Sequence, residues 1–397
     1  MEKHVAPSLK PKLIRVVTFP ISFRYLLRGQ LRFMAQHFEL IAVSTPGPEL
    51  ADTGADEGVA TVGIGLTRKI TPFQDLVSLF KMIRFFWREA PDIVHSHTPK
   101  AGLIAMMAAK VAGVPTRIHT VAGMPLMVTK GFKRQLLLCT ERLAYACATV
   151  VVPNSQGLKD YLMAESLTPS AKIHFFEPGS SNGINLAHYQ RTPEVQALAD
   201  TLAHQLALQD RFVFLFAGRM VKDKGVEELV TAFVKRYEEN PTVALMMAGD
   251  FDHGLNQISE ATHHLLHTHP GIHLLGFTPD IRISLAACDV LLLPSYREGL
   301  PQVLLQACAM EVPCITTDIM GCNEVIHPEV NGLIVPPRDW EALAHAMKRL
   351  SEDTGLLNRV TAQARSSVQR YNQVAIWGQL LGFYMKQLPV KNPDGVL

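Results

Sequence analysis

Short apolar segments alternate with longer amphipathic segments along almost the entire chain. In the first half, the apolar segments are typical of strands, and the segments with apolar residues three or four positions apart are typical of helices. The predicted strands are 13–19, 40–43, 92–95, 116–120 and 149–152, and the predicted helices are 72–88, 100–112, 132–146 and 155–164. Strands that alternate with helices in this way form right-handed β-α-β units around a parallel sheet.

The same pattern starts again in the second half. Between the two series, residues 178–185 combine Pro, Gly, Ser and Asn, which is typical of a linker. A helix is predicted over 192–206, directly before the second series. The predicted strands of that series are 212–217, 243–248, 272–275, 290–293, 314–317 and 332–335, and only helices are predicted after them, over 341–350, 355–367 and 372–387.

We therefore expect an α/β protein of two Rossmann-like, doubly wound domains. The first spans residues 1–185 and the second spans 186–370. Residues 371–397 are expected to form a C-terminal helix and tail that pack back toward the first domain. Because open parallel sheets bind ligands beyond the carboxyl ends of their strands, we expect the domains to face each other across a cleft lined by the loops that follow these strands.

The composition is that of a folded protein, and we expect no export signal. The 397 residues are 48% hydrophobic and 19% charged, which is enough apolar material for two cores. No apolar run approaches the roughly 18 residues needed to cross a bilayer. The N-terminus leads into a predicted strand, so we expect a cytoplasmic protein. Six scattered cysteines without a CxxC pair predict buried thiols rather than disulfides or zinc ligands.

Charge is distributed unevenly, although the net charge is only +2. Residues 1–185 carry 21 Lys and Arg against 13 Asp and Glu, whereas residues 186–397 carry 17 against 23. A basic first half favours contact with an anionic membrane surface or a phosphorylated acceptor. The alternative is a solvated charge bias without a partner. No nucleic-acid partner is expected.

The first of two motifs in the second half is a basic, glycine-bounded turn. A predicted strand leads into Gly218, the bases Arg219, Lys222 and Lys224 follow, and a helix begins after Gly225. Glycine allows close backbone approach, and the bases together with a helix N-terminus favour the phosphates of a nucleoside diphosphate. The alternative is a solvated basic turn.

The second motif begins at Ser295 with the sequence Ser-Tyr-Arg-Glu-Gly-Leu-Pro. Pro301 stands where a helix begins, Glu298 precedes that helix, and Gln306 lies in its second turn. A carboxylate and an amide at these positions can bind sugar and ribose hydroxyls. The alternative for Glu298 is an acid favoured at a helix entry by the macrodipole. Two such motifs, each directly after a predicted strand of the second series, favour the binding function.

Together these motifs resemble the donor domain of the GT-B glycosyltransferases, specifically the large retaining family 4. The resemblance extends over essentially the whole chain, including 152–155 and 178–185. It implies that Arg219 and Lys224 bind the donor pyrophosphate and stabilise the departing nucleoside diphosphate, and that Glu298 contacts the transferred sugar. The further donor contacts that it implies are Gly218, Gly276, Phe277, Thr278, Gly299 and Leu300.

The sequence departs from the family pattern at Gln306. The family's Glu-x7-Glu segment ends in a glutamate that usually binds the ribose hydroxyls. Glutamine still accepts and donates hydrogen bonds, but it lacks the strength of a charged carboxylate. We therefore expect Gln306 to alter donor affinity more than chemistry.

The first half contains candidates for catalysis and for acceptor binding. His119 stands at the end of a predicted strand, before a Gly-Pro turn, and is expected to face the cleft. The resemblance implies that it approaches the sugar and phosphate of the donor. His97 and Lys100 follow another strand and Gly29 follows the first, so these three are acceptor-side candidates. For each histidine, one of 16 in the chain, a structural role is the alternative.

Two segments of the first half interleave basic and aromatic residues. In 81–88, we expect Phe85, Phe86 and Trp87 to pack under the sheet while the bases face water. The segment 130–134 instead favours contact with an anionic bilayer.

The resulting hypothesis is a retaining glycosyltransferase that moves a sugar from a nucleoside-diphosphate donor, expected to be a UDP-sugar. The acceptor would be a glycan or a polyprenyl-pyrophosphate-linked sugar in envelope polysaccharide synthesis, with peripheral contact at the inner face of the cell membrane. No cofactor or essential metal is expected, and the Asp-Phe-Asp sequence at 250–252 is interpreted as a turn. The alternatives are a non-catalytic nucleotide-sugar or glycan-binding protein, suggested by Gln306, and a GT-B-type nucleotide-sugar epimerase.

Overall fold

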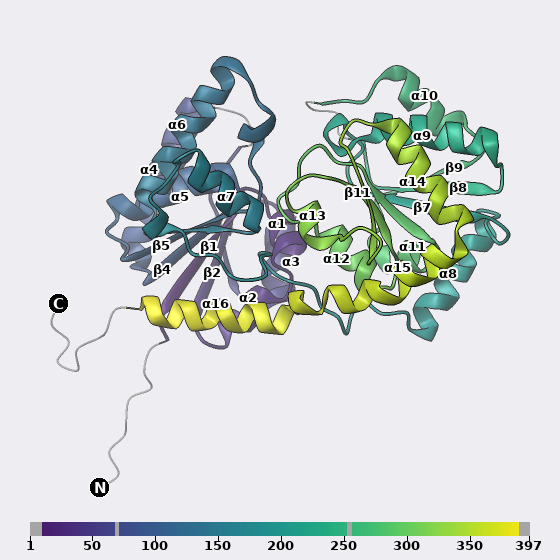
Figure 1. Ribbon diagram of the computed structural model, residues 1–397. Helices are drawn as coiled ribbons and strands as arrows, with labels where there is room; N and C mark the ends of the chain where they lie inside the picture. The colour runs from purple at the N-terminus through teal and green to yellow at the C-terminus, as the bar shows by residue number, and fades with distance from the viewer. Residues whose placement is uncertain (1–9, 68–70, 252–255, 389–397) are drawn as a thin grey trace, which may run out of the picture. The chain divides into compact units, whose positions relative to one another are not determined.

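The computed structural model of the protein describes residues 10–388 except 68–70 and 252–255. The chain folds into two compact units (Figure 1). Unit 1 comprises the residues up to Asn182 together with those from Val374 onward, and unit 2 is Gly183–Gln373. The chain therefore leaves unit 1, builds unit 2 and returns to unit 1 for its last helix.

Unit 1 is built on a parallel sheet in the strand order β3-β2-β1-β4-β5-β6. The five strands predicted for this half are present. The sequence does not predict β3, because none of its four residues is fully buried and they form no apolar run. The strands are β1 (Lys12–Val16), β2 (Glu39–Ser44), β3 (Ala60–Gly63), β4 (Ile93–His97), β5 (Thr116–Val121) and β6 (Val150–Pro153).

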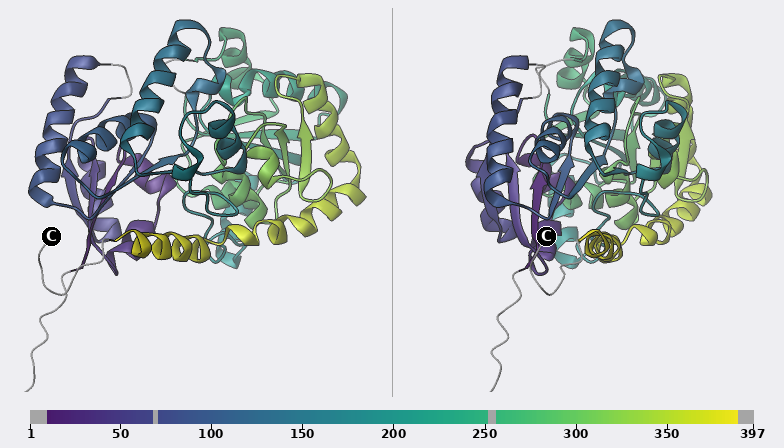
Figure 2. Two further views of the ribbon diagram at one scale, coloured as in Figure 1. Left: turned by 60° about the vertical axis from the view of Figure 1, so that its left-hand side comes forward. Right: turned by 90° about the vertical axis from the view of Figure 1, so that its left-hand side faces the viewer.

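Helices cover both faces of this sheet. On one face, α5 (Pro99–Val111) packs between α4 (Pro72–Glu89) and α6 (Gly131–Cys147). On the other face, α2 (Gln30–Ala35) and α16 (Gln373–Gln387) share a core with β1, and α16 lies along the sheet (Figures 1 and 2). The remaining helical segments are α1 (Ile21–Leu26), α3 (Pro48–Glu57), η1 (Pro125–Val128), α7 (Gln156–Ala164) and η2 (Ser170–Lys172).

Unit 2 contains a second parallel sheet, in the order β12-β11-β10-β7-β8-β9. All six predicted strands are present, and only β9 differs, by one residue. Most of their residues are buried, as expected for strands covered on both faces. The strands are β7 (Phe212–Ala217), β8 (Val243–Ala248), β9 (Ile272–Gly276), β10 (Val290–Leu293), β11 (Cys314–Thr317) and β12 (Gly332–Val335).

Two hydrophobic cores lie on opposite faces of this second sheet. One core includes α8 (Pro193–Gln205), α11 (Ile281–Ala286) and α12 (Gln302–Ala309). The other includes α9 (Val226–Glu239), α10 (Glu260–Thr268) and α14 (Trp340–Glu352). The remaining segments are η3 (Lys222–Lys224), α13 (Cys322–Val325), α15 (Thr354–Ser367) and η4 (Gln369–Tyr371). Over the described residues, no helix combines the length and apolar character that a bilayer span requires.

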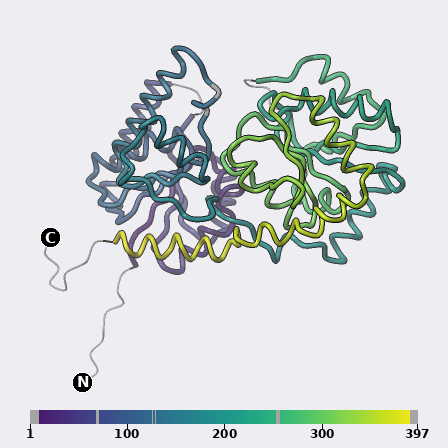
Figure 3. Tube along the Cα trace, viewed as in Figure 1, coloured from purple at the N-terminus to yellow at the C-terminus, as the bar shows by residue number. Residues whose placement is uncertain are grey.

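The two units repeat one topology, which can be followed along the tube in Figure 3. In each sheet the first strand of the unit lies beside its fourth: β1 beside β4 in unit 1, and β7 beside β10 in unit 2. Successive strands are added outward from this pair in both directions. Such a reversal of strand order opens a crevice at the carboxyl ends of the two central strands, where doubly wound folds bind ligands. We call each of these places a switch point.

Candidate active site

The loops that follow β7 and β10 meet at the switch point of unit 2. β7 leads through η3 to Gly225, whose φ is +68°. A Cβ at Gly225 would overlap the carbonyl oxygen of Pro294, which follows β10. Glycine permits both this left-handed backbone conformation and this close approach. The Lys-Gly pair of the first motif is therefore explained by the packing of two loops that are distant in sequence.

Lys224 and Glu298 form an ion pair across these two loops. Ser295 Oγ donates a hydrogen bond to Glu298 Oε1 at 2.7 Å. The side chains of Lys224 and Glu298 are 22% and 13% exposed, so the pair is shielded from bulk water yet still accessible. The structure thus brings together one predicted residue from each of the two motifs.

Neighbouring side chains hold the loop that carries Glu298. Arg297 donates a hydrogen bond to Asp223 Oδ2 at 3.0 Å, and the N–H of Tyr296 donates to the carbonyl oxygen of Asp223 at 2.9 Å. The Tyr296 hydroxyl donates to Glu228 Oε1 at 2.6 Å. Burial and the Glu228 carboxylate raise the pKa of Tyr296, so its hydroxyl remains a donor at neutral pH. Sequence reasoning missed this support, because the partners of Arg297 and Tyr296 lie far away in the chain.

The predicted glycines of the other donor loops lie at the same edge of the sheet. A Cβ at Gly249, which follows β8, would overlap the carbonyl oxygen of Gly218, which follows β7. The N–H of Gly249 donates to the carbonyl oxygen of Gly276 at 2.8 Å. The loops after three adjacent strands are therefore packed backbone to backbone. The predicted residues that directly follow these glycines are Arg219, Phe277 and Thr278, of which Arg219 and Phe277 are exposed.

The turn after Glu298 is buried and tightly packed. Gly299 and Leu300 are both buried. A Cβ at Gly321, whose φ is +80°, would overlap the carbonyl oxygen of Gly299. Pro301 caps α12, which begins one residue later. The backbone that positions Glu298 is consequently fixed on both sides.

Gln306 has a partner that the sequence does not reveal. Its Nε2 donates a hydrogen bond to the hydroxyl of Tyr189 at 2.9 Å. Tyr189 lies 117 residues earlier, before α8, and Arg365 binds its carbonyl oxygen at 2.8 Å. This hydrogen bond sets the orientation of the Gln306 side chain, and contact of Gln306 with the donor ribose remains a prediction.

At the switch point of unit 1, polar residues form a buried network. Arg15 on β1 donates to His97 Nε2 at 2.7 Å and to Gln30 Oε1 at 2.6 Å. It also donates to the Tyr384 hydroxyl at 3.0 Å, and that hydroxyl contacts His95 Nδ1. Arginine only donates, so His97 carries its proton on Nδ1 and is neutral.

The electrostatics of this network follow from burial. Desolvation lowers the pKa of both His95 and His97 well below the usual value, and nearby Arg15 acts in the same direction. Burial also raises the pKa of Tyr384 to about 12. The candidate His97 is therefore bound within a neutral, hydrogen-bonded network around one buried guanidinium.

His119 lies near the end of β5, two residues before the last residue of the strand, as the sequence predicts. Its buried imidazole packs against the first turn of α5, where a Cβ at Gly102 would overlap the ring. Ser96 Oγ lies 2.8 Å from its Nδ1, and the Tyr145 ring is also adjacent. Burial lowers the pKa of His119 to about 4, so the ring is neutral at pH 7. Its role in catalysis stays a prediction.

The other two acceptor-side candidates have partners within unit 1. Lys100 forms an ion pair with Asp75 of α4. Gly29, with φ of +79°, caps α2, and its N–H donates to Glu57 at 2.7 Å. The N–H of Arg32 donates to the other oxygen of Glu57 at 3.0 Å. The carboxylate of Glu57 thus occupies this helix N-terminus, and contact of Gly29 or Lys100 with an acceptor remains a prediction.

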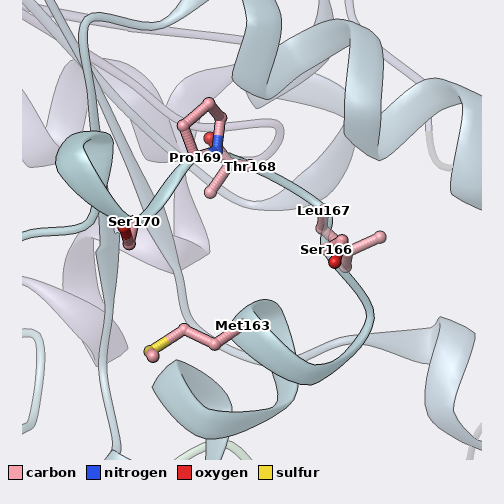
Figure 4. A pocket seen from close by; sticks show the side chains of 6 residues that line it. All are labelled: Met163, Ser166, Leu167, Thr168, Pro169 and Ser170. Atoms are coloured by element: carbon pink, nitrogen blue, oxygen red, sulfur yellow. The ribbon is translucent and has the colours of Figure 1, made fainter.

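A shallow pocket elsewhere in unit 1 is separate from these residues. It is lined by the end of α7 and the turn that follows it (Figure 4). The lining residues are Met163, Ser166, Leu167, Thr168, Pro169 and Ser170, none of which is ionisable. The pocket lining therefore contains no charged side chain that could bind a diphosphate. Asp252 of the Asp-Phe-Asp sequence lies outside the described residues, so its interpretation as a turn remains a prediction.

Two parallel α/β units of one topology define the GT-B fold. The chain belongs to the family 4 glycosyltransferases. Residues 200–367 match the family model described as glycosyl transferases group 1, and residues 23–179 match the glycosyl transferase 4-like domain. The protein is accordingly an enzyme that transfers a glycosyl group.

Relatives match this chain over most of its length. The capsular polysaccharide biosynthesis glycosyltransferase CapM of Staphylococcus aureus is 34% identical over 94% of this chain and 96% of its own. The UDP-Gal:alpha-D-GlcNAc-diphosphoundecaprenol alpha-1,3-galactosyltransferase of Escherichia coli is 28% identical over 86% and 89%. The crystal structure of Anabaena HepE with UDP and glucose has the same fold, with a TM-score of 0.81 and 19% identity over 95% of this chain and 100% of that one.

Proposed function

We propose that this enzyme transfers a sugar, with retention of configuration, from a nucleoside-diphosphate donor to a polyprenyl-diphosphate-linked acceptor in envelope polysaccharide synthesis. The observation that carries the proposal is the Lys224–Glu298 pair at the switch point of unit 2. The acceptor class is supported by the relatives, whose names include capsular polysaccharide synthesis and transfer to diphosphoundecaprenol-linked sugars. The donor is proposed to be a UDP-sugar.

In the proposed reaction, Lys224 changes its partner. Without donor, its ammonium is neutralised by Glu298. A diphosphate placed beyond β7 competes for Lys224, and charge-assisted hydrogen bonds to phosphate are strong. Arg219, two residues after the end of β7, is proposed to bind the same diphosphate. The bond between the anomeric carbon and the phosphate oxygen breaks, an acceptor hydroxyl oxygen bonds to that carbon, and the hydroxyl proton passes to the leaving phosphate. Both cations stabilise the negative charge that grows on the leaving nucleoside diphosphate.

Release of Lys224 leaves Glu298 available to the sugar. Its carboxylate accepts from Ser295 at one oxygen, so the other can accept from a sugar hydroxyl. The buried turn at Gly299 and Leu300 keeps Glu298 in place while the partner changes. We propose no metal in this reaction, because the positive charges of Lys224 and Arg219 can balance the charge of the diphosphate.

The two alternative functions receive less support. The relatives named above are transferases, and neither a nucleotide-sugar epimerase nor a non-catalytic binding protein is among them. Gln306, which suggests the binding protein, is held by Tyr189, and its amide can still accept a hydrogen bond from a ribose hydroxyl. We therefore propose that Gln306 contributes to donor affinity in an active enzyme.

Peripheral contact with an anionic membrane is the last part of the proposal. A polyprenyl-linked acceptor is anchored in a bilayer, so its sugar lies at the bilayer surface. The basic charge of residues 1–185 favours approach to such a surface.

A donor screen tests the function. The protein is incubated with a panel of nucleotide sugars, with and without a polyprenyl-diphosphate-linked acceptor and a chelator, and released nucleoside diphosphate and glycosylated lipid are measured. We expect acceptor-dependent release with at least one UDP-sugar, unchanged by chelator. A donor that raises the melting temperature without turnover on any lipid acceptor would support the binding protein instead. Loss of turnover with chelator would contradict the metal-free mechanism.

A further inference from the structure

α4 presents a second apolar face on the side opposite to the core. Its inner face is buried and includes Met82, Ile83, Phe85 and Phe86. On the outer face, Phe73, Phe80 and Trp87 are 80%, 64% and 62% exposed. The expectation that Trp87 packs under the sheet with Phe85 and Phe86 is therefore wrong for Trp87.

The exposed residues lie on one stripe of the helix. Positions 73, 76, 77, 80, 84 and 87 follow the three- and four-residue spacing that places side chains on one side of a helix. Leu76 and Val77 are also exposed. A contiguous apolar surface of this kind is uncommon on a soluble unit without a binding partner. We call the residues Phe73, Leu76, Val77, Phe80 and Trp87 the outer α4 stripe.

Basic residues accompany the outer α4 stripe, whereas the acids of α4 are neutralised. Lys81 and Arg84 are exposed on the same side of the helix. Asp75 forms an ion pair with Lys100 of α5. Glu89 is paired with Lys12 and with Arg88. The surface around the stripe is therefore cationic.

A similar, shorter stripe occurs on α6. Phe132, Leu136 and Leu143 are exposed at helical spacing, and Lys133 and Arg142 beside them are exposed as well. α4 and α6 flank α5 in one layer of unit 1. The same combination of solvent-exposed apolar and basic side chains therefore occurs on two helices of this layer.

We propose that the outer α4 stripe docks on the surface of an anionic bilayer. Aromatic side chains enter the interface between headgroups and acyl chains, while lysine and arginine bind anionic headgroups. A second copy of this chain fits less well, because two symmetric α4 faces would bring Lys81 and Arg84 close to their own copies. The proposal rests on the proposed function in one respect: docking would bring the enzyme to the surface where a polyprenyl-linked acceptor is anchored.

Vesicle co-sedimentation of the full-length protein tests the docking surface. Vesicles of phosphatidylcholine with and without phosphatidylglycerol are compared. The wild-type protein is expected to bind the anionic vesicles, less so at high salt. The triple substitution Phe73→Ser, Phe80→Ser and Trp87→Ser, and the double substitution Lys81→Glu and Arg84→Glu, are each expected to weaken binding by about tenfold or more.

Matched controls come from exposed residues of unit 2. Leu198→Ser on α8 and Arg359→Glu on α15 change the same kinds of exposed side chain and should leave vesicle binding unchanged. Circular dichroism checks that each variant is folded. Unaltered binding of both stripe variants, or equal binding to neutral vesicles, would overturn the proposal. A concentration-dependent dimer abolished by the triple substitution would assign the stripe to self-association instead.

Donor turnover separates this inference from the proposed function. With a water-soluble acceptor analogue, both stripe variants should keep wild-type turnover, because the stripe lies outside the donor-binding residues. Vesicle binding without turnover of any donor would contradict the proposed function and leave the docking surface intact. Donor turnover without vesicle binding would contradict the docking surface and leave the proposed function intact.

Discussion

The two units share one topology, but their switch points contain opposite kinds of polar arrangement. Between β1 and β4 of unit 1, Arg15 and His97 are buried and hydrogen-bonded to each other. Between β7 and β10 of unit 2, Lys224 and Glu298 form an ion pair whose side chains are still partly exposed. The same strand order therefore supports two different arrangements. In unit 1, neutral side chains surround one buried arginine, and in unit 2 a lysine and a glutamate form an accessible ion pair.

Solvation explains what each arrangement can do. Around Arg15, loss of one partner leaves buried polar atoms without hydrogen bonds, at a cost of about 1–3 kcal/mol for each atom. Lys224 and Glu298 retain contact with water, so a diphosphate can replace the carboxylate without leaving a buried charge unpaired. We infer that the network of unit 1 stabilises the fold and that the pair of unit 2 is available to a ligand.

Lys224→Ala is expected to have the largest effect on activity. Without this cation, the charge on the leaving diphosphate is less stabilised, and kcat should fall by about 100- to 1000-fold. The rate of nucleoside diphosphate release with the donor found in the screen measures this. Lys222→Ala, two residues earlier and more exposed, is the matched control and should stay within about twofold of wild type. Equal losses for both variants would mean that general positive charge matters, not the switch-point pair.

Arg15→Ala should lower stability rather than catalysis. His97, Gln30 and Tyr384 lose a buried donor at once, so the free energy of unfolding should fall by about 3 kcal/mol. Urea denaturation at pH 7 provides the measurement, with exposed Arg24→Ala of α1 as the control. A stable Arg15→Ala protein without donor turnover would show that the network serves the reaction and that the contrast between the switch points is mistaken.

Acidification should weaken unit 1 before unit 2. The pKa of His119 is about 4 in the folded protein and about 6.5 in the unfolded chain. The unfolded chain therefore binds the extra proton between these values, so the stability that neutral His119 provides is present above pH 6.5 and is lost as the pH falls toward 4. At pH 5 the loss from His119 alone is about 2 kcal/mol, and His95 and His97 shift in the same direction.

Tryptophan fluorescence resolves the two units in this experiment. Two single-tryptophan variants are made, in which the other tryptophans are replaced by phenylalanine. One keeps Trp377, which reports on unit 1, and the other keeps Trp340, which reports on unit 2. The fluorescence of each is followed during urea unfolding at pH 7 and at pH 5. The unit 1 transition should move to lower urea at pH 5, more than that of unit 2. The exposed His264→Gln of α10 should leave both transitions unchanged. Equal shifts would contradict the assignment of the buried histidines as the acid-sensitive groups.

Tyr189→Phe should produce the smallest change. It removes one hydrogen bond to Gln306, so the donor KM should rise by about two- to tenfold with little change in kcat. Gln306→Glu should preserve or tighten donor binding, because the Tyr189 hydroxyl can donate to a carboxylate as well. The comparison variant is Tyr296→Phe, because the Tyr296 hydroxyl binds Glu228 and not Gln306. A large loss of donor binding in Gln306→Glu would show that this position has acquired another role.

Local pattern accounts for much of what could be predicted. Most residues of the unit 2 strands are buried, so these strands are short, largely apolar runs that can be seen in the sequence. Lys224 and Glu298 could be proposed because each lies in a compact motif of glycine and charged residues. The partners Asp223 for Arg297 and Tyr189 for Gln306 could not, because the residues of each pair are 74 and 117 positions apart. No local period connects such distant positions.

The sequence by itself determined the alternation of strands and helices, the repeat of that pattern, and the glycines and charges of the donor loops, because these depend on neighbours in the chain. Tertiary structure alone decided which polar groups lose water. Arg15 is buried and bonded to Tyr384, a residue 369 positions away in the chain. The first turn of α5 covers His119. Trp87 remains exposed, although its neighbour Phe86 is buried. Desolvation depends on which distant segments pack over a side chain, and that information is absent from its local sequence.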